Sequence, residues 1–156
     1  MADKTEKRVA IVTGASRGIG AEVAKHIAAD GRHVVCVARN LDKLNEVVAQ
    51  IAAAGGTANA LTCDISDAAS IEAAVSGVTD AFGGIDILVN SAGIVDLAPA
   101  EELSSAAWTR TIDVNLTGSF LMAQAVGRAM IEAGKGGRIV NLASQAGSVA
   151  IEGHVA

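Results

Sequence analysis

Residues 8–20 read RVAIVTGASRGIG and join a short apolar run to a glycine-rich turn. The run at 8–14 carries β-branched residues and closes on a glycine, which is typical of a buried strand. In the segment 18–30 that follows, apolar residues recur at helical spacing, and Gly31 is placed to cap its carboxyl end. This order of strand, turn and helix predicts the first half of a β-α-β unit.

The same alternation of short apolar runs and helical periods continues along the chain. Four further runs are typical of buried strands: 33–38, 57–63, 85–90 and 138–143. Three further segments carry helical periodicity: 41–54, 67–82 and 104–133. Strands this apolar, separated by helices, indicate a parallel sheet that is covered by helices on both faces. Right-handed connections then give an α/β fold, a doubly wound Rossmann-type sheet with strand order 3-2-1-4-5.

Two details of the helices are expected from the residues. Ser66 stands where an amino-terminal cap of the helix 67–82 would be. Along the helix 104–133, four apolar residues stand four positions apart and form one stripe: Trp108, Ile112, Leu116 and Phe120. This stripe gives the helix enough apolar surface for more than one contact.

Length and composition limit the class of protein. A chain of 156 residues is expected to form one domain, 1–156. Lys and Arg number 12 against 17 Asp and Glu, so the net charge of −5 gives no general attraction to nucleic acid or to anionic lipid. The first eight residues lack an apolar signal region, and no apolar run has the length of a membrane span. Cys36 and Cys63 show no metal-ligand spacing, so we expect reduced thiols in a cytoplasmic protein.

The turn TGASRGIG at 13–20 is the first candidate site. Glycines let the backbone approach a ligand closely, and the start of the following helix offers unpaired N–H groups and the positive end of its dipole. The pyrophosphate of a dinucleotide fits both features. A methyltransferase or a plain tight turn uses such a stretch too, and the spacing is G-x-x-x-G-x-G rather than the common G-x-G-x-x-G. Its place after the first strand of a β-α-β unit favours the dinucleotide.

The end of the second strand indicates which dinucleotide is bound. A site for NAD often carries Asp or Glu here to hold the ribose 2′-hydroxyl, whereas in this chain Ala38 is followed by Arg39. The guanidinium of Arg39 suits a 2′-phosphate, and Arg17 in the glycine turn is a second cation nearby. The alternative is a solvated surface arginine. The residues favour NADP over NAD, with NADPH bound at least about tenfold more tightly than NADH.

Five motifs, in order along the chain, resemble those of the short-chain dehydrogenase/reductase family. The first is the glycine turn, and the other four are CDISD at 63–67, NSAG at 90–93, DVNLTG at 113–118 and GRIVNLAS at 137–144. The resemblance covers residues 8–154, and Ser91 departs from the second Asn of the family's N-N-A-G motif. It implies an oxidoreductase that transfers hydride between a nicotinamide cofactor, NADP(H) or less favoured NAD(H), and an alcohol/carbonyl substrate.

The resemblance also assigns roles in cofactor binding. Asp64 is expected to accept a hydrogen bond from the adenine amino group and Ile65 to cover the adenine ring, although Asp64 also suits the entry of a helix. Asn90 is expected to brace the sheet, while Ala92 and Gly93 lie beside the cofactor ribose. The predicted cofactor-binding residues are Gly14, Ser16, Arg17, Gly18, Ile19, Gly20, Arg39, Asp64, Ile65, Asn90, Ala92 and Gly93.

Two residues are expected to serve the reaction itself. By resemblance, Ser144 hydrogen-bonds the reacting oxygen, and Asn115 belongs to a proton relay through a water. The alternatives are an ordinary strand-end hydroxyl for Ser144 and a helix-kinking polar residue for Asn115. The family's acid is a tyrosine in a Tyr-x-x-x-Lys motif, and this chain contains no tyrosine. The family's spacing places that tyrosine one position beyond Ala156.

We therefore expect the chain to be the first part of a longer enzyme and to be inactive alone. The alternative is a natural 156-residue product that serves as a non-catalytic nucleotide-binding or interaction module. His154 titrates near neutral pH, but a histidine at the end of the chain without an ordered partner is expected to be solvated. No metal-ligand spacing is present, so no metal is expected.

The sequence says least about the substrate. The end of the chain, from NLASQAG to EGHVA, is similar to segments of sugar-alcohol dehydrogenases of the family, which hints at a sugar or polyol. A 3-oxoacyl thioester reductase is the alternative within the family, and ketones or hydroxysteroids stay open. The resemblance also implies a homodimer or homotetramer built partly through the helix 104–133.

Overall fold

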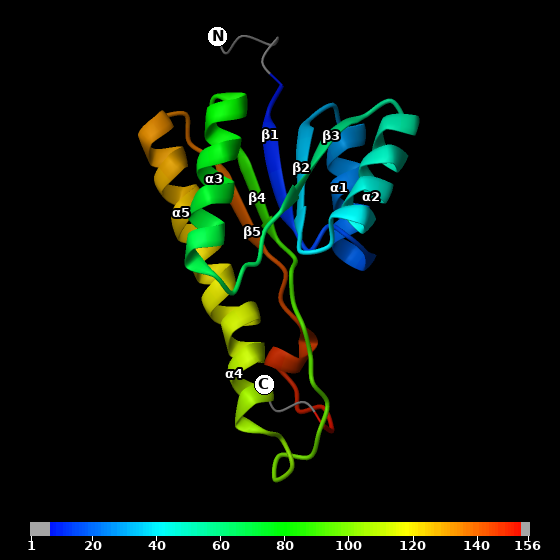
Figure 1. Ribbon diagram of the computed structural model, residues 1–156, viewed down its shortest axis with the longest axis vertical. Helices are drawn as coiled ribbons and strands as arrows, with labels where there is room; N and C mark the ends of the chain where they lie inside the picture. Colours follow the sequence, from blue (N-terminus) through cyan, green and yellow to red (C-terminus); the bar gives the residue numbers. More distant parts are fainter. Residues whose placement is uncertain (1–6, 154–156) are drawn as a thin grey trace.

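The computed structural model describes residues 7–153, which form a sheet flanked by helices (Figure 1). Its strands are β1 (Val9–Thr13), β2 (His33–Ala38), β3 (Thr57–Thr62), β4 (Ile87–Asn90) and β5 (Arg138–Asn141). Its α-helices are α1 (Gly18–Ala29), α2 (Leu41–Ala53), α3 (Ala68–Phe82), α4 (Ser105–Ile112) and α5 (Ser119–Ala133). A π-helix, η1 (Asp113–Gly118), joins α4 to α5, and a 3₁₀-helix, η2 (Gln145–Gly147), follows β5. His154 lies outside the described residues.

The five strands form one parallel sheet in the order β3-β2-β1-β4-β5, which confirms the predicted Rossmann-type fold and strand order. Adjacent residues of β1 face opposite sides of the sheet. Ile11 belongs to the core shared with α3 and α5, and Val12 belongs to the core shared with α1 and α2. Both faces are therefore covered by helices (Figure 1), which explains why the strands are apolar on both sides.

The carboxyl ends of all strands lie at one edge of the sheet, because the strands are parallel. The glycine turn follows β1 at this edge, and the loop 91–104 leaves from the end of β4. In Figure 1 this loop, α4 and η2 extend beyond the sheet as its narrower lower part. Candidate site residues from distant parts of the sequence are thereby collected at one edge.

The predicted helix 104–133 is continuous but has a π-helical middle, so it consists of α4, η1 and α5. Gly118, at the end of η1, packs against the chain between β3 and α3. A Cβ at this position would collide with the carbonyl oxygen of Ile65. A π-helical turn is wider than an α-helical turn and often marks a functional site. In this chain the π-helical turn is the DVNLTG motif itself, residues 113–118.

The apolar stripe of this helix points away from the core. Trp108, Leu116 and Phe120 are exposed and Ile112 is half-buried, whereas Met122 lies buried against the sheet. The face that covers the sheet is thus made by other residues. The stripe is left available for a contact outside the described part of the chain.

The predicted cap of α3 is wrong by one residue. Asp67 caps the helix, and its Oδ1 accepts a hydrogen bond from the N–H of Ala69 at 3.1 Å. Ser66 is held instead by Asp64, whose Oδ1 accepts bonds from the N–H and the Oγ of Ser66 at 3.0 and 2.7 Å. Because this turn uses the serine hydroxyl, the next residue caps the helix.

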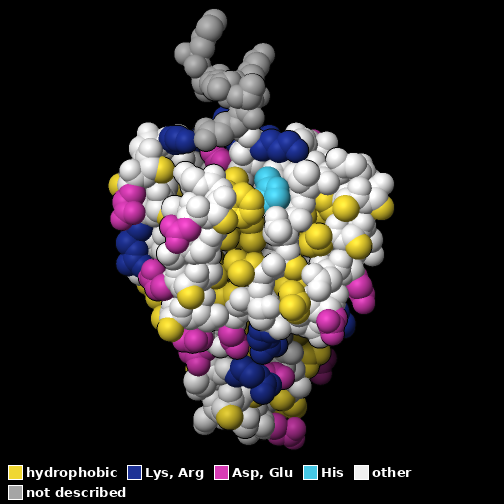
Figure 2. Space-filling view, turned by 45° about the horizontal axis from the view of Figure 1, so that its top comes forward, with side chains coloured by type: hydrophobic (Ala, Val, Ile, Leu, Met, Phe, Trp, Pro, Cys, Tyr) yellow, Lys and Arg dark blue, Asp and Glu magenta, His cyan; other side chains and the backbone are white. Residues whose placement is uncertain are grey.

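The surface seen in Figure 2 mixes charges of both signs. Lys and Arg side chains lie among Asp and Glu side chains around this face, and hydrophobic side chains gather along its middle. This face therefore offers no extended patch of one sign to a polyanion. Within residues 7–153, no helix is both long enough and apolar enough to cross a membrane.

Candidate active site

The turn after β1 fits closely against the turn after β4. Gly14 has a φ of +68°, and a Cβ on it would lie 2.8 Å from the Cα of Ala92. Thr13 Oγ1 accepts hydrogen bonds from the N–H groups of Ser91 and Ala92, each at 3.1 Å. Thr13 was not among the predicted site residues. A hydroxyl residue buried at the end of an apolar strand is the signal that indicates it, because a buried polar group requires a partner.

The start of α1 has no side-chain cap. The helix begins at Gly18, which has a φ of +56° and open space where a Cβ would stand. Arg17 precedes it without a side-chain capping bond, and the first turn holds no acidic residue. A Cβ on Gly20 would lie 2.5 Å from the carbonyl oxygen of Gly14, so the turn is folded tightly onto the helix. The positive end of the helix dipole is thus presented beside a compact turn, which suits an anionic group.

Ser16 and Ile19 complete this turn. Ser16 is half-buried, whereas the side chain of Ile19 is 68% exposed in the first turn of α1. Ile19 therefore contributes an apolar contact surface next to the uncapped helix start.

The ends of β2 and β3 provide a second part of the site. Arg39 is exposed, and its positive charge acts on Asp64. The pKa of Asp64 is lowered, mainly by the hydrogen bonds from the hydroxyl and the N–H of Ser66 and to a smaller extent by Arg39. The carboxylate is therefore ionised and oriented by its own turn.

Ile65 lies in the core next to Asp64. Its side chain is buried together with residues of α3 and α5. The structure thus gives Ile65 a packing role, and its contact with an adenine ring stays a prediction.

Asn90 connects the end of β4 to two other elements. It is buried, and its Nδ2 donates to the Ser119 carbonyl oxygen at 3.1 Å and to Asn141 Oδ1 at 3.0 Å. These bonds tie β4 to α5 and to β5. A buried amide with two acceptors is a strong constraint on the sheet edge from which the loop 91–104 departs.

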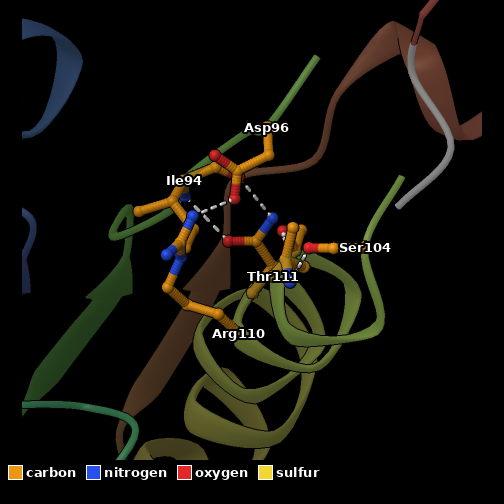
Figure 3. Close-up of polar contacts among 7 residues, drawn as sticks. Ile94, Asp96, Ser104, Arg110 and Thr111 are labelled. Atoms are coloured by element: carbon orange, nitrogen blue, oxygen red, sulfur yellow. Dashed lines mark hydrogen bonds and ion pairs between the residues drawn. The ribbon is translucent and has the colours of Figure 1, made fainter. Parts of the chain in front are cut away.

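Asn115 lies in η1 and holds the same loop. Its Oδ1 accepts a bond from the N–H of Ile94 and its Nδ2 donates to the carbonyl oxygen of Ile94, both at 2.8 Å. A Cβ on Gly93 would lie 3.5 Å from Asn115 Oδ1. Figure 3 shows Ile94 among these polar contacts, with Asp96 and Arg110 pointing toward one another beside it. The amide of Asn115 thus binds main chain in the way that a neighbouring strand would.

Ser144 follows β5 and caps η2. Its Oγ accepts a hydrogen bond from the N–H of Ala146 at 3.2 Å, and the residue is exposed. That bond uses an acceptor site of the hydroxyl and leaves its proton available for donation. Among the described residues, no hydrogen bond links Ser144 to Asn115.

A cavity of about 450 Å³ lies between the turn after β3 and α4. It is lined by Ser66, Ser105, Ala106, Thr109, Arg110 and Asp113. None of these is a predicted site residue, so the cavity lies next to the candidate site and is not part of it. Within the described part of the chain, no cluster of three or more His, Cys, Asp or Glu residues is arranged to hold a metal ion.

The parallel sheet, the close glycine turn and the uncapped helix start define a doubly wound Rossmann-type α/β protein. The sequence matches the short chain dehydrogenase family over residues 8–156, and the chain belongs to that family. This confirms the resemblance carried by the five motifs.

Similar proteins include two polyol dehydrogenases. The chain is 50% identical over 153 residues to a D-threitol dehydrogenase of Mycolicibacterium smegmatis, covering 98% of this chain and 58% of the relative. It is 44% identical over 149 residues to an NAD-dependent glycerol dehydrogenase of Listeria innocua, covering 96% and 57%. The crystal structure of a metagenomic short-chain oxidoreductase in complex with NADP has a TM-score of 0.89 at 42% identity, covering 94% and 66%. The chain therefore spans somewhat more than half the length of the curated relatives.

Proposed function

We propose that this chain forms the cofactor-binding part of an NADP-dependent oxidoreductase that interconverts an alcohol and its carbonyl compound. The observation that carries the proposal is the start of α1, where Gly18 leaves open space and no side chain caps the helix. The pyrophosphate of a dinucleotide would bind there, and Ile19 would contact the cofactor beside it. When bound, the cofactor supplies the site for hydride transfer.

The residues at the ends of β2 and β3 would hold the adenosine half. Asp64 is ionised and fixed by Ser66, so it would accept a hydrogen bond from the adenine amino group. Arg39 and Arg17 are exposed and would bind a 2′-phosphate. Because no acidic residue follows β2 directly, nothing at that position opposes the phosphate. Ala92 would lie beside the cofactor ribose.

The similar proteins include one that is named as NAD-dependent and one that is bound to NADP, so the preference of this protein for NADP over NAD needs its own test. Titration of the protein with NADPH and with NADH tests it. We expect NADPH to bind at least about tenfold more tightly, a difference of about 1.4 kcal/mol. Equal dissociation constants would remove the preference and leave dinucleotide binding itself in place.

Ser144 and Asn115 would serve the alcohol side of the site. Ser144 retains a hydroxyl proton to donate to the reacting oxygen, which favours the polarised carbonyl. Both polar atoms of the Asn115 side chain bind Ile94, so a part in a proton relay would fall to its main-chain carbonyl. The side chain itself would act as a positioning group for the loop 91–104.

For the substrate we propose a polyol or sugar alcohol. Support comes from the names of two relatives, a threitol and a glycerol dehydrogenase, at 50% and 44% identity. Initial rates with the full-length protein, NADP⁺ and a panel of polyols would test this, with 3-oxoacyl thioesters and NADPH as the comparison. Turnover of thioesters alone would show that the protein is a 3-oxoacyl thioester reductase instead. Dinucleotide binding without turnover of either panel would exclude both substrate classes, and a non-catalytic module would be favoured only if ketones and hydroxysteroids are not turned over either.

The 156-residue chain on its own is proposed to bind the dinucleotide without turnover, because it contains no tyrosine to protonate the reacting oxygen. Measurable polyol oxidation by this chain would contradict that statement. The binding titration serves as the internal check that the chain is folded.

A second copy of the protein is the proposed partner of the apolar stripe that runs along α4, η1 and α5. Leu116 lies in this stripe and is 64% exposed. Light scattering should report a dimer or tetramer, and Leu116→Glu should shift it toward the monomer. Leu41→Glu is the matched control, because Leu41 is 48% exposed in α2, which covers the other face of the sheet. A monomeric unaltered protein would refute the assembly.

A further inference from the structure

The segment 94–98 of the loop after β4 has two different sides. Ile94, Asp96 and Ala98 are half-buried, whereas Val95 and Leu97 are 52% and 63% exposed. Alternation with a period of two is the pattern of an extended chain. One side of this segment therefore faces the protein, and Val95 and Leu97 face outward.

The inner side is held by the helix that contains α4 and η1. Asn115 makes its two hydrogen bonds to the main chain of Ile94. Two residues further along, Asp96 Oδ2 accepts from Arg110 Nη2 at 2.5 Å, and Figure 3 shows these two side chains meeting. Arg110 and Asn115 hold the segment and are five residues apart in the sequence. A π-helical turn contains more residues than an α-helical turn, so η1 brings these two side chains nearer to the same side of the helix.

The segment runs between two parts of the proposed site. The segment continues directly from the turn that contacts Gly14, and its far end contacts the chain that follows Ser144. That contact is a hydrogen bond from the N–H of Ala98 to the carbonyl oxygen of Gly153 at 3.1 Å. The segment thus connects the cofactor turn to the stretch after β5, which makes it a wall of the site.

The register of this wall depends on one contact. The bonds from Asn115 go to main-chain atoms, which any residue offers, so they do not distinguish Ile94 from its neighbour. The side chain of Ile94 packs partly on the core, and Val95 would fill a similar volume there. The pairing of Asp96 with Arg110 does distinguish the residues, because it requires a carboxylate. A slip by one residue would turn Val95 and Leu97 inward and Asp96 outward.

We propose that the Asp96–Arg110 ion pair is a positioning pair that sets the register of residues 94–98 and so determines which side chains face the substrate. In the set register, Val95 and Leu97 present an apolar surface to the carbon skeleton of the alcohol, and the carboxylate is kept away from it. The contact of Val95 and Leu97 with the alcohol rests on the proposed function. The register of residues 94–98 is independent of the proposed function.

Thiol labelling tests the register without any activity. The natural Cys36 and Cys63 are 0% and 2% exposed, so a new cysteine is read against a low background. Leu97→Cys should react faster than Ala98→Cys, because position 97 faces outward. Adding Asp96→Asn should reduce the ratio of the two rates by up to about fivefold, the most that an exposed ion pair commonly provides.

Two further variants make the labelling result specific. Asp96→Arg combined with Arg110→Asp restores an ion pair and should restore the ratio of labelling rates. Glu72→Gln removes the exposed ion pair between Glu72 and Arg128, away from the site, and should leave the ratio unchanged. A ratio that Asp96→Asn does not change, or that the reversed pair does not restore, would overturn the proposal.

Steady-state kinetics of the full-length protein test the consequence for substrate. Asp96→Asn should raise KM for the alcohol severalfold with the dissociation constant of NADPH unchanged, and the reversed pair should restore KM. An unchanged KM alongside a changed labelling ratio would overturn the role in substrate selection. If no alcohol is oxidised at all, the proposed function fails, whereas the labelling ratio still decides the register.

Discussion

The position of a Cβ on Gly14 would lie 2.8 Å from the Cα of Ala92, so the turns after β1 and β4 meet backbone to backbone. Gly14 also has a φ of +68°, a region that side-chain-bearing residues rarely adopt. Two independent reasons therefore require glycine here, a close approach and a left-handed conformation.

Gly14→Ala should destabilise the fold strongly. The left-handed conformation alone costs about 1–2 kcal/mol for a residue with a Cβ, and the clash with Ala92 adds to it. We expect a loss of about 3 kcal/mol or more in the free energy of unfolding, measured in urea.

Gly18→Ala is the matched control for this substitution. Gly18 has a φ of +56° but open space around the position of a Cβ. The expected loss of stability is therefore about 1 kcal/mol. Dinucleotide affinity should fall in this variant, because the new methyl group stands where the pyrophosphate is proposed to bind. Equal stability losses at positions 14 and 18 would contradict the role assigned to the contact with Ala92.

Asn90→Ala should weaken the edge of the sheet from which the site is built. It removes the donor to the Ser119 carbonyl oxygen and to Asn141 Oδ1 at a buried position, and unsatisfied buried groups cost about 1–3 kcal/mol. Urea unfolding measures the loss. Asn45→Ala, at an exposed position of α2, is the control and should change stability by about 0.5 kcal/mol or less.

The fold could be predicted because its signals are local. Each strand is a short apolar run and each connection holds a helix, so the alternation alone gives the parallel sheet. Ser66 and Asp67 are equally good caps by residue type, and the cap of α3 falls on Asp67 because Ser66 is engaged by Asp64. The π-helical middle of 104–133 depends on Gly118 meeting the backbone of Ile65, a contact that periodicity does not reveal.

The candidate site also has features that the sequence indicates and features that depend on the folded chain. The glycine turn and Arg39 could be proposed as site residues from the sequence, because the chemistry expected of them is contained in a few consecutive residues. Thr13 and Asn115 act on residues 78 and 21 positions away along the chain, Ser91 and Ile94. Such bonds depend on the packed fold, so the sequence did not indicate which residues Thr13 and Asn115 bind.

Stability should fall as the pH drops through the titration range of His33. Its pKa is lowered from the usual 6.5, first by burial and then by the charge of Lys7, while a hydrogen bond with Asn59 opposes this. Its Nε2 is buried without a hydrogen-bond partner, and its ring lies 4.5 Å from that of Phe82. The folded state therefore favours the neutral ring.

The sign of this pH dependence follows from proton binding. Below a pH of about 6.5 the unfolded chain binds a proton that the folded chain resists, so the free energy of unfolding decreases as the pH falls toward and through the lowered pKa. Urea unfolding between about pH 7.5 and about pH 5 measures this slope. His33→Gln should flatten it. An unchanged slope in that variant would assign the effect to other groups.

The proposed preference for NADP depends most on Arg39. It is exposed at the end of β2, and no carboxylate follows that strand directly. Arg39→Gln should raise the dissociation constant of NADPH about tenfold, since a charge-assisted pair with the 2′-phosphate is lost, and should leave that of NADH nearly unchanged. Isothermal titration with both cofactors measures the two constants. Arg138→Gln, an exposed arginine at the opposite edge of the sheet, is the control and should affect neither. If Arg39→Gln weakens NADPH and NADH equally, the guanidinium contacts a part that both cofactors share, and the selection of NADP must come from Arg17 or be absent.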